Sequence, residues 1–357
     1  MVDAAHAYLD ARVSMMTRQL HDRHGLAQLA ELTLPDLAQR LGLDTLLDPS
    51  QSLRSRSRAI EQALVHQLLA ELQVLIRPLH GAERELILAW GRKYALYNLK
   101  TLLRGKLHAF EAETIAAQLF ELPAPIRLPI RTLFRAEGVD ELLRQLETGP
   151  YRQIARQARE VYARQREPFA LEAAIDQHYY LDLAHHARAF GAPHGNALRR
   201  LIGAMLDRVD LLWLLRFRLC YGLSPSATFY WLVPSTGLLG RERLLHLVAL
   251  EGLEAVLGTL PEPLAGRLAG SDDIAEVQRR VNAHSAATAR ASLAYADSAP
   301  ARALAYLMLR ETELLGLFAI VQGRLLGLAQ HTIDAALEHV PSGCTWRAAV
   351  VDRSETD

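Results

Sequence analysis

Apolar residues recur at intervals of three and four positions along most of the chain, as Leu142, Leu143 and Leu146 do. This spacing places apolar side chains on one face of an α-helix, whereas a half-buried strand alternates apolar and polar residues. The sequence is also rich in Leu, Ala, Arg, Glu and Gln, which favour helices. We therefore predict an all-α protein with about a dozen helices.

Clusters of Gly, Pro and Ser divide this helical pattern into segments, because these residues favour turns and end helices. The uncharged stretch 219–240 has the length of a membrane-spanning helix, but Pro225 and Pro234 interrupt it. We expect a loop with short helices there. The other breaks are expected at residues 49–57, 123–129, 149–150, 191–195, 261–271 and 298–300.

Parts of the sequence recur at nearly constant distances. Residues 137–143 (EGVDELL) are similar to residues 251–257 (EGLEAVL), which lie 114 positions later. Upstream of these two stretches, Asn98 corresponds to Asp210 at an offset of 112. A fainter third copy begins at Gly316, 218 residues after Asn98. An internal repeat of this length predicts repeated helical units.

We place three tandem helical-bundle units at residues 1–150, 151–270 and 271–357. The third unit is too short for the final helices of the other two, and its polar end, 341–357, is expected to be disordered. Three such units can stack as an open solenoid or close around a pseudo-threefold axis, which would leave a central cavity. The repeat pattern leaves both arrangements open.

Composition excludes several classes of function. The 357 residues include 40 basic and 40 acidic side chains, so neither a nucleic-acid-binding tail nor a polybasic membrane anchor is expected. Cys220 and Cys344 lack the spacing of a zinc site or a disulfide framework, which fits a reducing, cytoplasmic setting. Asp3, His6 and Asp10 interrupt the N-terminal segment, so we expect no signal peptide. Neither a P-loop nor a G-x-S-x-G motif occurs in the sequence, and we expect no catalytic residue, cofactor or metal.

Four segments, taken in their order and spacing, resemble a known family. They are residues 7–13 (AYLDARV), 97–106 (YNLKTLLRGK), 171–180 (LEAAIDQHYY) and 305–313 (AYLMLRETE). The family comprises the C subunits of archaeal and bacterial V/A-type rotary ATPases and the d subunits of the eukaryotic vacuolar enzyme. The chain departs from the family pattern at several positions, which suggests a divergent branch: Ala95, Asp210, Gly316 and Gln322.

The resemblance implies a funnel of three units related by pseudo-threefold symmetry around a central cavity. It also implies a mechanical function without an active site. The protein would lie peripherally on the cytoplasmic face of the membrane-embedded proteolipid ring and receive the tip of the central shaft. Its partners would be the shaft subunits and the ring, and its membrane contact would be indirect, through the ring.

Two sets of residues are candidates for the contact with shaft or ring. The first is a set of cations on the repeated helix, for which the simpler interpretation is that they hold neighbouring helices together. The second is an aromatic run within 219–240, for which the simpler interpretation is packing between units two and three. The cations are Arg104, Lys106, Arg216, Arg218 and Arg324, and the aromatic residues are Phe229, Tyr230 and Trp231.

Two other classes of function remain open. One is a helical-repeat adaptor. The other is an all-α, Mg²⁺-dependent diphosphate-processing synthase, in which Asp272, Asp273 and Glu276 would bind the metal, although helix capping explains these residues more simply. Several histidines could share a helix face with an aspartate and bind a metal, but a solvated helix is the simpler interpretation; they are His178, Asp182, His185 and His186. His21 and His24 are uninformative.

Overall fold

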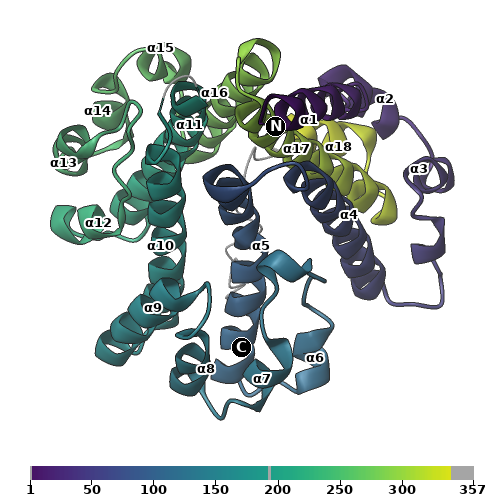
Figure 1. The fold of residues 1–357 in the computed structure, drawn as a ribbon, viewed down its shortest axis with the longest axis horizontal. Coiled ribbons are helices and arrows are strands. Elements are labelled where there is room, and N and C mark those ends of the chain that lie inside the picture. The colour runs from purple at the N-terminus through teal and green to yellow at the C-terminus, as the bar shows by residue number, and fades with distance from the viewer. Residues whose placement is uncertain (1, 192–193, 339–357) are drawn as a thin grey trace.

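The computed structural model describes residues 2–191 and 194–338, and over these residues it contains eighteen α-helices and no strand (Figure 1). The prediction of an all-α protein is therefore confirmed. The helices outnumber the expected dozen because short helices of five to eight residues fill several connecting stretches. The stretch 341–357 and Cys344 lie outside the described residues.

The first half of the chain forms nine helices. They are α1 (Val2–Thr17), α2 (Arg23–Ala30), α3 (Leu34–Leu41), α4 (Leu53–Ile76), α5 (Gly81–Leu107), α6 (Ala112–Ala116), α7 (Ile130–Arg135), α8 (Val139–Leu146) and α9 (Arg152–Gln165). Two 3-10 turns, η1 (Asp44–Leu46) and η2 (Ala124–Ile126), lie between them.

The second half forms the other nine. They are α10 (Pro168–Arg188), α11 (His194–Leu215), α12 (Pro225–Trp231), α13 (Arg241–Val248), α14 (Leu253–Gly258), α15 (Leu264–Leu268), α16 (Ile274–Tyr295), α17 (Ala299–Leu325) and α18 (Gln330–Glu338). One π-helical turn, η3 (Arg216–Cys220), continues α11. The expectation of a loop with short helices over 219–240 is confirmed, since only α12 lies wholly inside that stretch.

Six helices of 21 to 27 residues form the frame of the molecule: α4, α5, α10, α11, α16 and α17. Successive members are joined in pairs by short turns. Each of the six packs against the next one along the chain, and α17 also packs against α4. The order of contacts therefore returns to its starting point.

Local sequence explains where these long helices begin. Ser52 accepts a hydrogen bond from the amide of Ser55 at the start of α4, and Asp273 accepts one from the amide of Glu276 at the start of α16. Ser298 does the same for α17, which has a proline in its first turn. Such caps satisfy amides that have no partner within the helix.

The short helices lie in three groups around this frame (Figure 1). Helices α6 to α8 follow α5, and helices α12 to α15 follow α11. The third group contains α2 and α3 from the N-terminal part of the chain, and both pack against α17, as α1 and α18 do. The two ends of the described chain are thus parts of one group.

The two larger of three hydrophobic clusters hold the frame together. The larger one joins α1, α4, α5, α10, α11 and α17, and its members include the fully buried Trp90 and Tyr94. A buried ion pair crosses this core, where Lys93 Nζ lies 2.6 Å from Glu311 Oε2, and Tyr94 donates a hydrogen bond of 2.6 Å to Glu311 Oε1. The smaller cluster lies among α11 and α13 to α16. No helix of the described residues is long and apolar enough to span a membrane.

Candidate functional site

Equivalent positions of α5 and α11 hold the segments that follow these helices. Asn98 donates to the carbonyl of Phe120 and accepts from its amide, both at 2.8 Å. Asp210 accepts from the amide of Val233 at 2.7 Å. The partner lies 22 residues downstream in the first case and 23 in the second. The matched residues of the sequence repeat therefore perform the same structural task.

The ends of α5 and α17 are also alike. A β-carbon at Gly105 would clash with Ile115, and one at Gly323 would clash with Ile333. Both pairs lie at the same offset, 218 residues, as the first and third copies of the repeat. After each glycine the chain turns through a backbone hydrogen bond to the glycine carbonyl, from residue 110 at 2.9 Å and from residue 328 at 2.8 Å. Only glycine lets the next short helix approach so closely.

Acidic residues on α11 and α17 also hold other segments. Asp207 lies one turn before Asp210, and Glu313 lies one turn before Gly316. Asp207 accepts from the amides of Leu238 and Leu239 at 2.9 and 2.7 Å, and burial raises its pKa in spite of these hydrogen bonds. Glu313 accepts from the amide of His21 at 2.8 Å, and His21 Nδ1 lies 2.6 Å from the same carboxylate. The segment held by α17 thus comes from the N-terminal part of the chain.

This contact is one of several between the N-terminal helices and α17. We expected residues 271–357 to lack room for their final helices, and helices α2 and α3 take a place beside α17. Gly316 of α17 contacts Leu26 of α2, and Arg324 donates to the carbonyl of Ala30. No sequence pattern identified the N-terminal helices as neighbours of α17.

The arginines among the five candidate cations join neighbouring helices or segments. Arg104 binds Glu172 of α10 through two hydrogen bonds of 2.5 Å, which raise the pKa of the guanidinium. Arg216 donates to Gln278 of α16 at 2.6 Å, and Arg324 also binds Gln330 at 2.6 Å. These contacts fit the simpler interpretation of the arginines as links within the chain.

Lys106 and Arg218 bind backbone carbonyls nearby. Lys106 Nζ donates to Phe134 at 2.8 Å, and Arg218 donates to Leu223 at 2.7 Å. All five candidate cations lie near the C-terminal ends of α5, of α11 with its continuation η3, and of α17, where positive charge complements the helix dipole. All five side chains are half-buried.

Large apolar side chains are exposed at the same three helix ends. Phe110 is 56% exposed just after α5, Tyr221 is 62% exposed just after η3, and Leu328 is 41% exposed just after α17. Exposed apolar groups at equivalent positions suggest contact with another molecule. We refer to Phe110, Tyr221 and Leu328, with the cations beside them, as the three helix ends.

The aromatic run belongs to α12 and is divided between core and surface. Trp231 is buried against Ala170 and Ala174 of α10, so it packs within residues 151–270 and not between units two and three as expected. The hydrogen bond from the segment after α12 to Asp210 explains this position, since it draws α12 toward the α10–α11 pair. Tyr230 is 58% exposed, and half-buried Phe229 lies under the guanidinium of Arg241.

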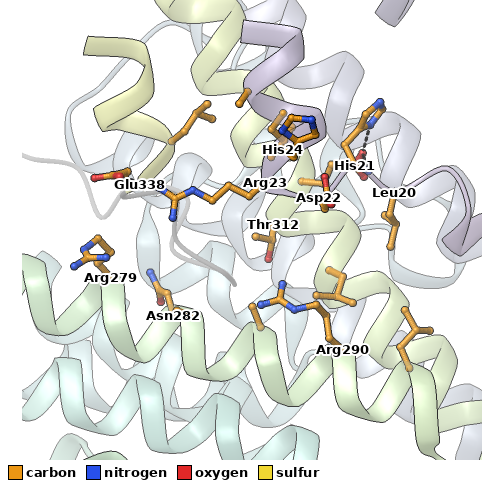
Figure 2. Close-up of a pocket in the computed structure, with 18 of the residues that line it drawn as sticks. Leu20, His21, Asp22, Arg23, His24, Arg279, Asn282, Arg290, Thr312 and Glu338 are labelled. Carbon is orange, nitrogen blue, oxygen red and sulfur yellow. Dashed lines mark hydrogen bonds and ion pairs between the residues drawn. The ribbon is translucent and has the colours of Figure 1, made fainter. Parts of the chain in front are cut away.

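A cleft of about 1040 Å³ is lined by residues of α2, α16, α17 and α18. Figure 2 shows Arg23 and Arg290 extending into it, with Arg279 and Asn282 on the α16 side. Arg23 forms an ion pair of 2.7 Å with Glu338, whereas exposed Arg290 has no ion-pair partner among the residues that the structure describes. His21 and His24, which sequence patterns left uninterpreted, also line this cleft.

The structure favours capping for the acidic motif at the start of α16. Asp273 caps the helix, and Glu276 binds both Arg279 and Arg280, which lower the pKa of this carboxyl to about 2. Carboxylates paired in this way are poor candidates for a metal–diphosphate site.

The histidines of α10 form no metal-binding cluster within the described part of the chain. His186 Nε2 lies 3.5 Å from Asp182, and the same aspartate lies 3.7 Å from Arg92. Burial lowers the pKa of His178.

Comparisons with known proteins agree with the resemblance found in the sequence. The model of the ATP synthase (C/AC39) subunit family matches residues 9–336. A relative from Methanocaldococcus jannaschii, the C subunit of an A-type ATP synthase, is 26% identical over 265 residues, which cover 72% of this chain and 65% of the relative. A protein of the same name from Haloquadratum walsbyi is 26% identical over 181 residues, which cover 49% of this chain and 52% of the relative. The chain thus spans less than two thirds of the length of each relative.

Proposed function

Because the chain belongs to the ATP synthase (C/AC39) subunit family, we propose that it is a non-catalytic socket subunit of a V/A-type rotary ATPase. It would receive the tip of the central shaft and connect it with the proteolipid ring, so that ATP-linked rotation and ion transport are coupled. The observation that carries this proposal is the order of helix contacts, in which α17 packs back against α4. A closed arrangement of helix pairs can surround an axis, whereas an open solenoid leaves its last helix at a free end.

The proposed closed form contains three units in pseudo-threefold order. The helix pairs α4–α5, α10–α11 and α16–α17 are the frames of these units, which we place at residues 1–150, 151–270 and 271–357. The matched hydrogen bonds of Asn98 and Asp210 support the equivalence of the first two. The matched contacts of Gly105 and Gly323 support the third, which α2 and α3 would complete.

The three helix ends are our proposed contact surface for partner subunits. Each combines an exposed apolar side chain with half-buried cations, which suits a protein surface that offers apolar groups and carboxylates. Tyr230 extends the end at η3, and Arg290 in the cleft offers a further cation at the surface. In this proposal the protein lies peripherally at the cytoplasmic face of the membrane and reaches the membrane only through the ring.

Purification of the tagged full chain from its native membranes in mild detergent tests this proposal. We expect the proteolipid ring and the shaft subunits to copurify with one copy of this chain. Recovery of the chain alone would contradict the rotary assignment. Recovery with unrelated proteins would instead favour the helical-repeat adaptor.

Variants then test the contact surface. A triple variant with Phe110→Ser, Tyr221→Ser and Leu328→Ser should lose ring or shaft subunits from the purified complex, while the isolated chain keeps its thermal midpoint. Tyr295→Ser is a matched control, because Tyr295 is 85% exposed but lies at the end of α16, beside the start of α17 and not beside the C-terminal end of α17. Equal recovery of partners with the triple variant and the control would show that the three helix ends are not the contact surface.

A further inference from the structure

Three side chains that are far apart in the sequence meet where three helices begin. His6 lies in the second turn of α1, Glu83 in the first turn of α5, and His194 at the first position of α11. Each offers one ligand atom, and the three atoms lie within 4.8 Å of one another. All three side chains are half-buried. Sequence spacing could not reveal this group, because 77 residues separate the first two members and 111 the last two.

The contacts around the group orient its members. His6 Nε2 lies 2.9 Å from Glu83 Oε2, and the two imidazole rings meet edge to face with their centroids 5.3 Å apart. His194 Nδ1 lies 3.0 Å from the hydroxyl of Ser298, which caps α17. A hydrogen bond to the second nitrogen of a metal-binding histidine fixes the ring and its tautomer. Ser298 is therefore placed to orient His194.

Two imidazoles and one carboxylate are a donor set that suits zinc. Zn²⁺ binds nitrogen at about 2.0 to 2.1 Å and carboxylate oxygen at about 2.0 to 2.2 Å, so tetrahedral ligand atoms lie about 3.4 Å apart. The observed separations, 2.9 Å for one pair and no more than 4.8 Å for the others, would reach this value through side-chain movements of about 1 Å. Mg²⁺ and Ca²⁺ prefer all-oxygen sites and suit this group less well.

We infer that His6, Glu83 and His194 together bind one Zn²⁺ ion, with the fourth position open to water. An ion held there connects the start of α1 with the starts of α5 and α11. The contact between His194 and Ser298 adds the start of α17 to this connection. The ion pair between His6 and Glu83 accounts for only two of the three side chains, whereas a bound metal ion accounts for the position of all three. This inference does not depend on the proposed function, since the site lies within a single chain.

Zinc binding to the full chain tests the inference. The purified protein is treated with a chelator, dialysed, and titrated with Zn²⁺ and separately with Mg²⁺, while heat release and the thermal midpoint are followed. We expect one Zn²⁺ per chain and, at saturating Zn²⁺, a thermal midpoint higher by a few degrees. Mg²⁺ should produce no shift. Co²⁺ in place of Zn²⁺ should give the visible absorption of a tetrahedral site.

The variants His6→Gln, Glu83→Gln and His194→Gln should each weaken Zn²⁺ binding at least tenfold. His186→Gln is the matched control, because His186 also lies beside a carboxylate but outside the group. Thermal midpoints without metal show whether each variant folds, and Ser298→Ala gives a milder second test through the orientation of His194. The inference is overturned if the wild type binds no Zn²⁺, or if the control weakens binding as much as the three variants do.

Discussion

The buried ion pair between α5 and α17 gives the sharpest test of how the frame is held together. The side chains of Lys93 and Glu311 are only 4% and 2% exposed, and Tyr94 donates to the same carboxylate. Glu311→Gln removes the negative charge but keeps an oxygen that can accept from Tyr94. The ammonium of Lys93 is then left buried without a counter-charge, which costs about 3 to 5 kcal/mol.

This cost translates into a measurable shift of the thermal midpoint. Globular proteins gain about 2.1 cal/mol/K of unfolding entropy per residue, or about 0.7 kcal/mol/K for a chain of this size. The midpoint of Glu311→Gln should therefore fall by about 4 to 7 °C in a calorimetric scan. The double variant with Lys93→Met, which also removes the unpaired ammonium, should recover part of this loss.

A surface ion pair provides the comparison. Arg23 and Glu338 have side chains that are 80% and 48% exposed, so Glu338→Gln should cost only about 0.2 to 1 kcal/mol. Our reasoning about burial would be refuted if Glu311→Gln and Glu338→Gln lowered the midpoint equally. It would also fail if the double variant were less stable than Glu311→Gln alone.

Three further predictions concern single positions. Burial raises the pKa of Asp210 well above its ordinary value, so the stability of the wild type should fall as pH rises through that pKa. Asp210→Asn should remove this loss of stability. Thermal midpoints of the two proteins that run parallel across the pH range would contradict the prediction. Gly105→Ala should lower the free energy of unfolding in urea by about 1 to 3 kcal/mol through the clash at Ile115, whereas Gly138→Ala, with open space around it, should not. Glu172→Gln should destabilise the protein at low salt and less at high salt, and a salt-independent difference would argue against an ion pair with Arg104.

Helical periodicity was enough to predict the class of the fold, and the prolines within 219–240 were enough to predict a loop with short helices there. It reports which face of a helix is buried but not against which helix that face packs. The role of Asp273 as a helix cap could be predicted because capping depends on residues three positions apart. Asn98 and Asp210 were correctly identified as a matched pair, since their local sequences recur, although their hydrogen bonds to Phe120 and Val233 could not be foreseen.

The candidate site could be predicted less well than the fold. Arg104 and Arg324 stood out through the repeat, but their partners Glu172 and Ala30 come from segments with no sequence relation to them. The simpler interpretation of the aromatic run was packing between units two and three, whereas Trp231 packs against α10. Contacts between remote segments depend on the path of the whole chain, which local patterns do not encode.

Because α2 packs against α17, it can reach its final place only after α17 has been synthesised. His21 leaves the ribosome 292 residues before Glu313, its partner, is made. At about 5 to 20 residues per second, the first segment waits about 15 to 60 s for the helix that it binds. The apolar faces of α2 and α3 have no native cover from α17 during that time, so these two helices are exposed to wrong associations. The segment that carries α2 and α3 therefore reaches its final place only long after it has been made.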